Sequence, residues 1–198
     1  IINSECKLVL TKNCRNTYEI ACTSYNVIDI PIKTNTNMIN GVQPSLTFAP
    51  SKSLIFLGRL IKYFKADENG YKDSEITILS MKPENDSIMN EVNKIDGIAI
   101  SRTRNNNSVF YTTSKKFKGL ESKVVIIVDI DETCFSDEKQ KRSFYVACSR
   151  ARHRLALFID GNDEKILKIA NAATKGAFSA KGKILTKTKT IMLNDDKF

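Results

Sequence analysis

The chain has 198 residues, of which 41% are hydrophobic and 27% charged, as in one ordinary globular domain with or without a tail. No apolar run approaches the roughly 20 residues that cross a bilayer, and no signal peptide is visible. The net charge of +9 favours a polyanionic partner such as nucleic acid. The five cysteines form no CxxC pair, which argues against a zinc site or disulfide framework and favours a reducing cytoplasm. Because the chain begins at Ile1, we expect a segment of a longer protein.

The hydrophobic pattern predicts strands and helices that alternate along the chain. Short apolar segments predict strands at 7–10, 75–80, 97–100, 109–113, 124–128 and 155–159. Amphipathic spacing and start signals predict helices at 18–21, 51–63, 83–95, 144–151 and 163–173. Residues 26–50 are polar and rich in proline, and we interpret them as a long surface connection. The alternation is typical of an α/β fold with a mostly parallel, doubly wound sheet. We predict one domain over 1–173 and a basic tail over 174–198, with one short strand or none.

Residues 144–154 carry the first candidate site. Phe144, Ala147, Cys148 and Ala151 form the apolar stripe of a helix that ends in basic residues and runs into a buried strand. Arginine presents a planar fork of donors that fits phosphate, so this helix end could hold an anion. The alternative is a solvated basic helix end, where cations complement the helix dipole.

Three segments resemble the signature motifs of one helicase family. Residues 118–121 (K-G-L-E before a strand) and 145–151 (Y-V-A-C-S-R-A on a helix) resemble the last two motifs of UvrD/Rep-like superfamily 1 helicases. Residues 10–17 are similar to the L-x-x-N-Y-R-S-T segment of the same helicases, with Cys14 in place of the usual tyrosine. The resemblance covers roughly residues 7–160 and implies a second RecA-like domain, with helices on both faces of a mostly parallel sheet.

The resemblance also implies which residues meet ATP. Arg15 and Arg150 would reach the γ-phosphate and offset the charge that develops in the transition state. Gly119 and Glu121 would meet the nucleotide, the glutamate through the ribose hydroxyls, and a glycine there allows close approach of the backbone. The alternative for Glu121 is a solvated side chain in a strand-entry turn. We expect Arg15 on a strand-to-helix turn, because ligands of open α/β sheets collect beyond the carboxyl ends of the strands.

A third set of residues matches the part of the family that touches single-stranded DNA. These are Thr113, Ser114 and Lys115, where the family usually has histidine in place of Lys115. A lysine would still contact a backbone phosphate as a point charge.

The sequence lacks a phosphate-binding loop. Residues 176–183 come close, but the second glycine is one place late and Ile184 follows the lysine, so Gly-Lys-[Ser/Thr] is absent. The strand 124–128 followed by Asp129 looks like a Mg²⁺-binding pattern, but we interpret it as a structural strand that leads into a surface loop. The resemblance therefore implies that the phosphate loop, the Mg²⁺ ligands and the catalytic glutamate come from an N-terminal RecA-like domain that this chain lacks.

We therefore predict the C-terminal motor domain of a cytoplasmic, ATP-dependent DNA helicase or translocase that acts on single-stranded or partly duplex DNA. The alternative is a non-catalytic nucleic-acid-binding or interaction module derived from a helicase half. A retained set of Arg15, Glu121 and Arg150 speaks against the alternative, because such a module needs no separated nucleotide contacts. The interval between Arg15 and Lys118 is too short for the large inserted domain of the DNA-repair members, which predicts a compact relative. We expect the isolated chain to hydrolyse ATP poorly or not at all.

Overall fold

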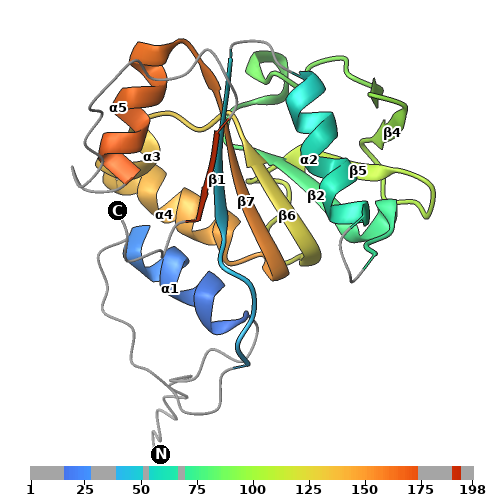
Figure 1. Cartoon of the computed structure of the whole chain (residues 1–198), viewed down its shortest axis with the longest axis horizontal. Coiled ribbons are helices and arrows are strands. Elements are labelled where there is room, and N and C mark those ends of the chain that lie inside the picture. Colours follow the sequence, from blue (N-terminus) through green and yellow to red (C-terminus); the bar gives the residue numbers. More distant parts are fainter. Residues whose placement is uncertain (1–15, 28–38, 51–53, 67–69, 174–188, 193–198) are drawn as a thin grey trace, which may run out of the picture.

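An eight-stranded sheet runs through the molecule in the computed structural model (Figure 1), which describes residues 16–27, 39–50, 54–66, 70–173 and 189–192. The strand order is β3-β4-β5-β2-β6-β7-β1-β8. The strands are β1 (Ser45–Pro50), β2 (Ile76–Ser80), β3 (Lys94–Ile95), β4 (Ile98–Ser101), β5 (Val109–Thr113), β6 (Ser122–Val128), β7 (Ala151–Gly161) and β8 (Lys189–Met192). Neighbours from β4 to β1 are parallel, and only the outer pairs β3–β4 and β1–β8 are antiparallel. The predicted mostly parallel sheet is confirmed.

Helices cover both faces of this sheet (Figure 1). They are α1 (Tyr18–Val27), α2 (Leu54–Ala66), α3 (Thr133–Ser136), α4 (Glu138–Cys148) and α5 (Asp163–Ala173), with short 3₁₀ turns η1 (Asp73–Glu75) and η2 (Glu84–Asp86). Helices α1, α4 and α5 lie on one face and α2 lies on the other. This is the predicted RecA-like arrangement. In the described part of the chain, no helix combines the length and apolar character needed to cross a membrane.

The alternation of side chains along β6 divides the core into two layers. Val125 and Ile127 pack with Phe144 of α4 on one face. Val124 and Ile126 pack with Leu57 of α2 and its neighbours on the other face. All six side chains are fully buried, so β6 is covered on both sides, as parallel sheets require.

The interpretation of residues 26–50 as a surface connection is wrong for its last part. Residues 45–50 form β1, which pairs with β7 on one side and β8 on the other. Leu46 and Phe48 are 1% exposed. The segment gave no strand signal because it lies between prolines, and its pairing partners come more than a hundred positions later in the chain.

The helix predicted at 83–95 is also absent from the structure. Residues 84–86 form η2, turns follow, and β3 occupies 94–95. Glu91 has a φ of 56°, in the left-handed region that ends an α-helix. Arg102 holds the turns in place, since its guanidinium donates to the Met89 carbonyl at 2.9 Å and also to the Val92 carbonyl. The apolar spacing that suggested a helix therefore comes from a turn fixed by long-range hydrogen bonds.

The helix predicted at 144–151 begins earlier and ends at Cys148, and β7 starts at Ala151. The other predicted strands and helices within the described residues are confirmed with shifted ends. The strand predicted at 7–10 and the capping segment 51–53 lie outside the described residues. Of the segment predicted as a tail, residues 189–192 form β8 along the edge of β1.

Candidate functional site

Two turns meet at the end of the sheet where β6 and β7 begin, which we call the amino edge. One turn carries Gly119 and Glu121 and leads into β6, and the other carries Ser149 and Arg150 and leads into β7. The Ser122 N–H donates to the Arg150 carbonyl at 3.1 Å. The residues that follow each turn, Ser122 and Ala151, are partners in the parallel ladder. The two predicted nucleotide contacts are thus held side by side by backbone pairing.

Asn16, which belongs to the motif at residues 10–17, also lies at the amino edge. Its side-chain amide donates to the Ser149 carbonyl at 2.9 Å and also to the Ala151 carbonyl. These two carbonyls flank Arg150, and Asn16 is only 7% exposed. Arg15 lies outside the described residues, but its neighbour in the chain is fixed against the Arg150 turn.

Arg150 is half-buried at the C-terminal end of α4. Its Nε donates to the Val146 carbonyl at 3.2 Å, and its backbone N–H donates to the Ala147 carbonyl at 3.1 Å. The Ser149 hydroxyl donates to the same Val146 carbonyl at 2.8 Å. A cation at this end of a helix also meets the negative end of the helix dipole. The guanidinium is therefore held at the amino edge by the last turn of α4.

Gly119 has a φ of +87°, a conformation that side chains other than glycine rarely adopt. A Cβ at this position would have no heavy atom within 4 Å. The glycine is therefore required by the backbone turn rather than by crowding. The open space beside it leaves room for a ligand to approach the main chain.

Glu121 is engaged by two arginines. Its carboxylate Oε2 lies 3.7 Å from Nε of Arg152, and its carbonyl accepts a hydrogen bond of 2.8 Å from Nη2 of Arg104. The Arg104 guanidinium also lies over the rings of Phe110 and Phe117, at 5.4 and 5.2 Å from their centroids. Arg104 was not identified from the sequence, because nothing in the loop 102–108 indicates that it folds back onto the Gly119 turn.

Gly119, Glu121 and Arg150 lie at the end of the sheet opposite to the one where ligands of open α/β sheets usually bind. The rule for open α/β sheets places ligands beyond the carboxyl ends of the strands. Here Gly119, Glu121 and Arg150 precede β6 and β7 and lie at their amino ends. The reason is local, since each turn leads into its strand rather than out of it.

Thr113 is the last residue of β5, and Ser114 and Lys115 follow it at the other end of the sheet. Thr113 is 9% exposed, and its hydroxyl accepts a long hydrogen bond of 3.4 Å from the Lys116 N–H. The Ser114 N–H donates to the Ser80 carbonyl at 2.9 Å, which fixes the start of the segment to the end of β2. Lys115 is exposed. The structure does not bring these residues to the amino edge.

The segment 114–121, which we call the crossover, joins the two ends of the sheet. It leaves β5, passes β2 and enters β6 in parallel orientation. Connections between parallel strands usually need a dozen or more residues. Phe117, which is fully buried, anchors this short one to the core, and its N–H donates to the Thr113 carbonyl at 3.1 Å. One short, anchored segment thus carries Ser114 and Lys115 at one end and Gly119 and Glu121 at the other.

The carboxylate of Asp129, which directly follows β6, accepts hydrogen bonds from three donors of the protein. Its Oδ2 accepts hydrogen bonds of 2.6 Å from the hydroxyls of Ser80 and Ser87, and its Oδ1 accepts one of 3.0 Å from the Ile88 N–H. The carboxylate is 4% exposed. This arrangement fits the structural interpretation rather than a metal ligand. Among the described residues, no three acidic, histidine or cysteine side chains gather as a metal site would need.

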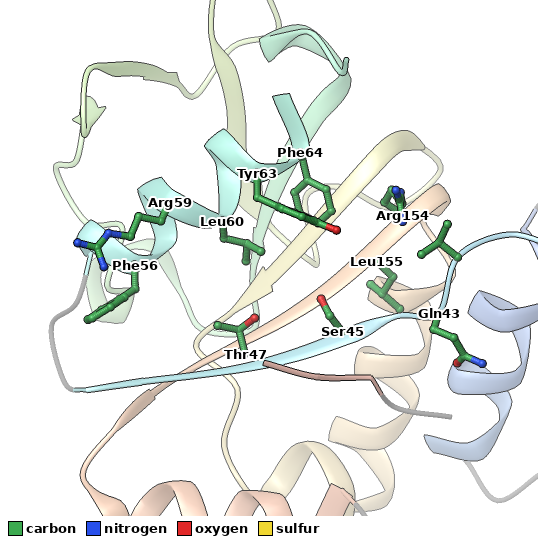
Figure 2. Close-up of a pocket in the computed structure, with 11 residues that line it drawn as sticks. Gln43, Ser45, Thr47, Phe56, Arg59, Leu60, Tyr63, Phe64, Arg154 and Leu155 are labelled. Atoms are coloured by element: carbon green, nitrogen blue, oxygen red, sulfur yellow. The ribbon is translucent and has the colours of Figure 1, made fainter. Parts of the chain in front are cut away.

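A cavity of about 460 Å³ lies on the face of the sheet that α2 covers, between α2 and the first part of β1 (Figure 2). Phe56, Leu60 and Tyr63 of α2 face Ser45 and Thr47 of β1 across it, with the side chains of Arg59 and Arg154 at its margins. It shares no lining residue with the amino edge or with the residues that follow β5.

Comparisons with known proteins agree with this architecture. The family model "UvrD-like helicase C-terminal domain" matches residues 108–158, which include β5, the crossover, β6, α4 and most of β7. Among solved structures, the C-terminal domain of a possible DNA helicase from Lactobacillus plantarum WCFS1 is similar with a TM-score of 0.56 and 18% identity. The match covers 76% of this chain and 89% of that one. No curated protein sequence matches. Residues 108–158 are thus similar to the family that the motifs indicated, and the fold agrees with that similarity.

Proposed function

We propose that the chain is the C-terminal motor domain of an ATP-dependent DNA helicase or translocase. The observation that carries the proposal is the meeting of three separated segments at the amino edge: Asn16, the Gly119–Glu121 turn and the Ser149–Arg150 turn. Each belongs to a motif that resembles a nucleotide contact of superfamily 1 helicases. Hydrogen bonds between the segments hold them together.

The amino edge offers the groups that a nucleoside triphosphate needs. Arg150 and its expected partner Arg15 would bind the γ-phosphate and offset the charge that builds up during phosphoryl transfer. Gly119 offers an open stretch of backbone, and the Glu121 carboxylate would accept from the ribose hydroxyls. ATP supplies the phosphoryl group, and a bound Mg²⁺ would neutralise its charge.

The rest of the site is expected from a second domain. The sequence has no phosphate loop, so an N-terminal RecA-like domain would supply that loop, the Mg²⁺ ligands and the catalytic glutamate across a shared cleft. Closure and opening of that cleft would step the two domains along the strand. Thr113, Ser114 and Lys115 at the far end of the crossover would hold the DNA.

The test is single-strand-stimulated ATP hydrolysis by the longer protein that contains this chain. Arg150→Ala should lower the stimulated rate by about 10³-fold or more, the contribution of an arginine finger. Arg59→Ala is a matched control, because it removes the same charge from an exposed position on the α2 face. It should leave the rate unchanged.

Two results would change the conclusion. If the wild-type protein hydrolyses no ATP with any single strand, the motor function is wrong and a non-catalytic binding module is the better account. If Arg150→Ala hydrolyses as fast as wild type, a motor function survives but Arg150 is not the arginine that stabilises the transition state.

A further inference from the structure

A shallow pocket of about 330 Å³ lies between the crossover and α4. We call it the crossover pocket, and six residues line it: Ser114, Lys115, Lys118, Arg142, Ser143 and Val146. The first three come from the crossover, and the last three share one face of α4. The fold therefore builds this pocket from two elements that meet only in the tertiary structure.

The lining of the crossover pocket suits an anion. Three of its six side chains are cations, two carry hydroxyl groups, and no carboxylate is among them. Lys115, Lys118 and Arg142 are exposed, so their charges face solvent and an incoming ligand. Arginine and lysine bind phosphate oxygens, the arginine through two parallel N–H groups. Val146 is the one hydrophobic residue of the lining.

We propose that the crossover pocket binds a backbone phosphate of the single DNA strand, with Arg142 on α4 as a strand contact. This inference rests on the proposed function and extends its strand site beyond Thr113, Ser114 and Lys115. Lys115 and Arg142 would hold the phosphate from opposite walls. A strand that follows residues 113–115 would thereby continue onto α4.

The crossover pocket lies close to the residue that anchors Arg150. Val146 forms part of its wall, and the Val146 carbonyl accepts the hydrogen bond from Nε of Arg150. Arg142 and Val146 are four residues apart, so they are neighbours on one face of the helix. A phosphate held by Arg142 therefore lies about one helical turn from the residue that anchors Arg150.

The experiment measures binding of a fluorescein-labelled oligothymidylate to the 198-residue chain by fluorescence anisotropy over a range of salt concentrations. Loss of one phosphate contact to a single strand should reduce the slope of log K against log salt by about 0.7. Arg142→Ala should show this change and bind about tenfold more weakly at low salt. Arg59→Ala, with the same change in net charge on the α2 face, should show neither effect. Thermal melting should confirm that both variants are folded, since both side chains are exposed.

Other outcomes would overturn the inference in distinguishable ways. If Arg142→Ala behaves like Arg59→Ala while Lys115→Ala weakens binding, the strand contacts residues 113–115 without reaching α4, so the inference about Arg142 is wrong and the proposed function stands. If Arg142→Ala instead weakens binding of a fluorescent ATP analogue by the longer protein, the pocket holds nucleotide phosphate. If it weakens only association with the N-terminal domain, the pocket is a protein contact. If the chain binds no oligonucleotide at any salt concentration, the strand contact fails, and the Arg150→Ala experiment still judges the motor function separately.

Discussion

Asn16 shows how one side chain can hold a site together. It is buried beside the Arg150 turn and donates to the carbonyls on both sides of that arginine. Neither carbonyl belongs to its own element, so the amide links the start of α1 to the end of α4. Gly119 is a second residue on which the site depends, because its left-handed backbone makes the turn between the crossover and β6.

Replacing Asn16 should destabilise the fold in a graded way. Asn16→Ala leaves buried carbonyls without their donor and should lower the free energy of unfolding by about 1–3 kcal/mol. Asn16→Asp should cost more, because a carboxylate has no proton to donate and would face two carbonyl oxygens. Urea unfolding measures both. The exposed Asn106→Ala is the control, expected within about 0.5 kcal/mol of wild type. Equal stability of all four proteins would contradict the role of the amide.

Comparing Gly119 with Gly97 separates a role in nucleotide binding from the cost of backbone strain. Their φ angles are +87° and +89°, and a Cβ at either position would have no heavy atom within 4 Å. Each glycine-to-alanine variant should therefore lose about 1–2 kcal/mol of stability, the cost of a left-handed residue. Only Gly119→Ala should also raise the KM for ATP in the longer protein. Equal KM values would remove Gly119 from the nucleotide site.

At the scale of elements, the crossover and β1 decide how the candidate site is supported. The crossover spans the sheet in few residues because Phe117 anchors it in the core. Strand β1 completes the parallel part of the sheet and supports β7, which follows the Arg150 turn. Without β1, one side of β7 would be an open edge.

The burial of β1 predicts a large effect for Phe48→Ala. Phe48 is 1% exposed and packs in the same cluster as Phe144 and Leu157, so its truncation should cost about 3–5 kcal/mol in urea unfolding. Ile55→Ala on α2 is the control. Ile55 is 63% exposed and its truncation should change stability by about 0.5 kcal/mol or less. A small effect of Phe48→Ala would contradict the burial of β1 and would favour a surface connection at residues 45–50, as the sequence pattern suggested.

At the scale of the whole molecule, the sheet separates two cores that must open together for the chain to unfold. Cys134 and Cys148 report on one of them, the α1–α4–α5 core, where they are 2% and 0% exposed. Both are free thiols. Burial raises the pKa of Cys134 to about 11 and raises the pKa of Cys148 as well.

These thiols should be protected from iodoacetamide as long as the domain is folded. The thiolate is the nucleophile, and at pH 8 the raised pKa values leave almost none of it. Peptide mass spectrometry should find both cysteines unlabelled in buffer and both labelled through the urea transition, with equal midpoints. Labelling of Cys148 before Cys134 would show that α4 opens locally.

The sequence by itself determined the fold class and the elements that carry their own signals. The apolar run 124–128 of β6, the amphipathic helices α2 and α5, and the motifs around Gly119 and Arg150 could be read locally, because each lies within one element or turn. The resemblance to UvrD/Rep-like helicases followed from the same motifs.

Only the tertiary structure decided where these elements meet. It set the turns before β6 and β7 side by side, fixed Asn16 against the Arg150 turn, and brought Arg104 onto the Glu121 turn. It also turned part of a predicted loop into β1 and a predicted helix into turns held by Arg102. In each case the deciding contact joins residues far apart in the sequence. The hydrogen bonds that fix these positions form only after the sheet has assembled, so no local pattern of residues can encode them.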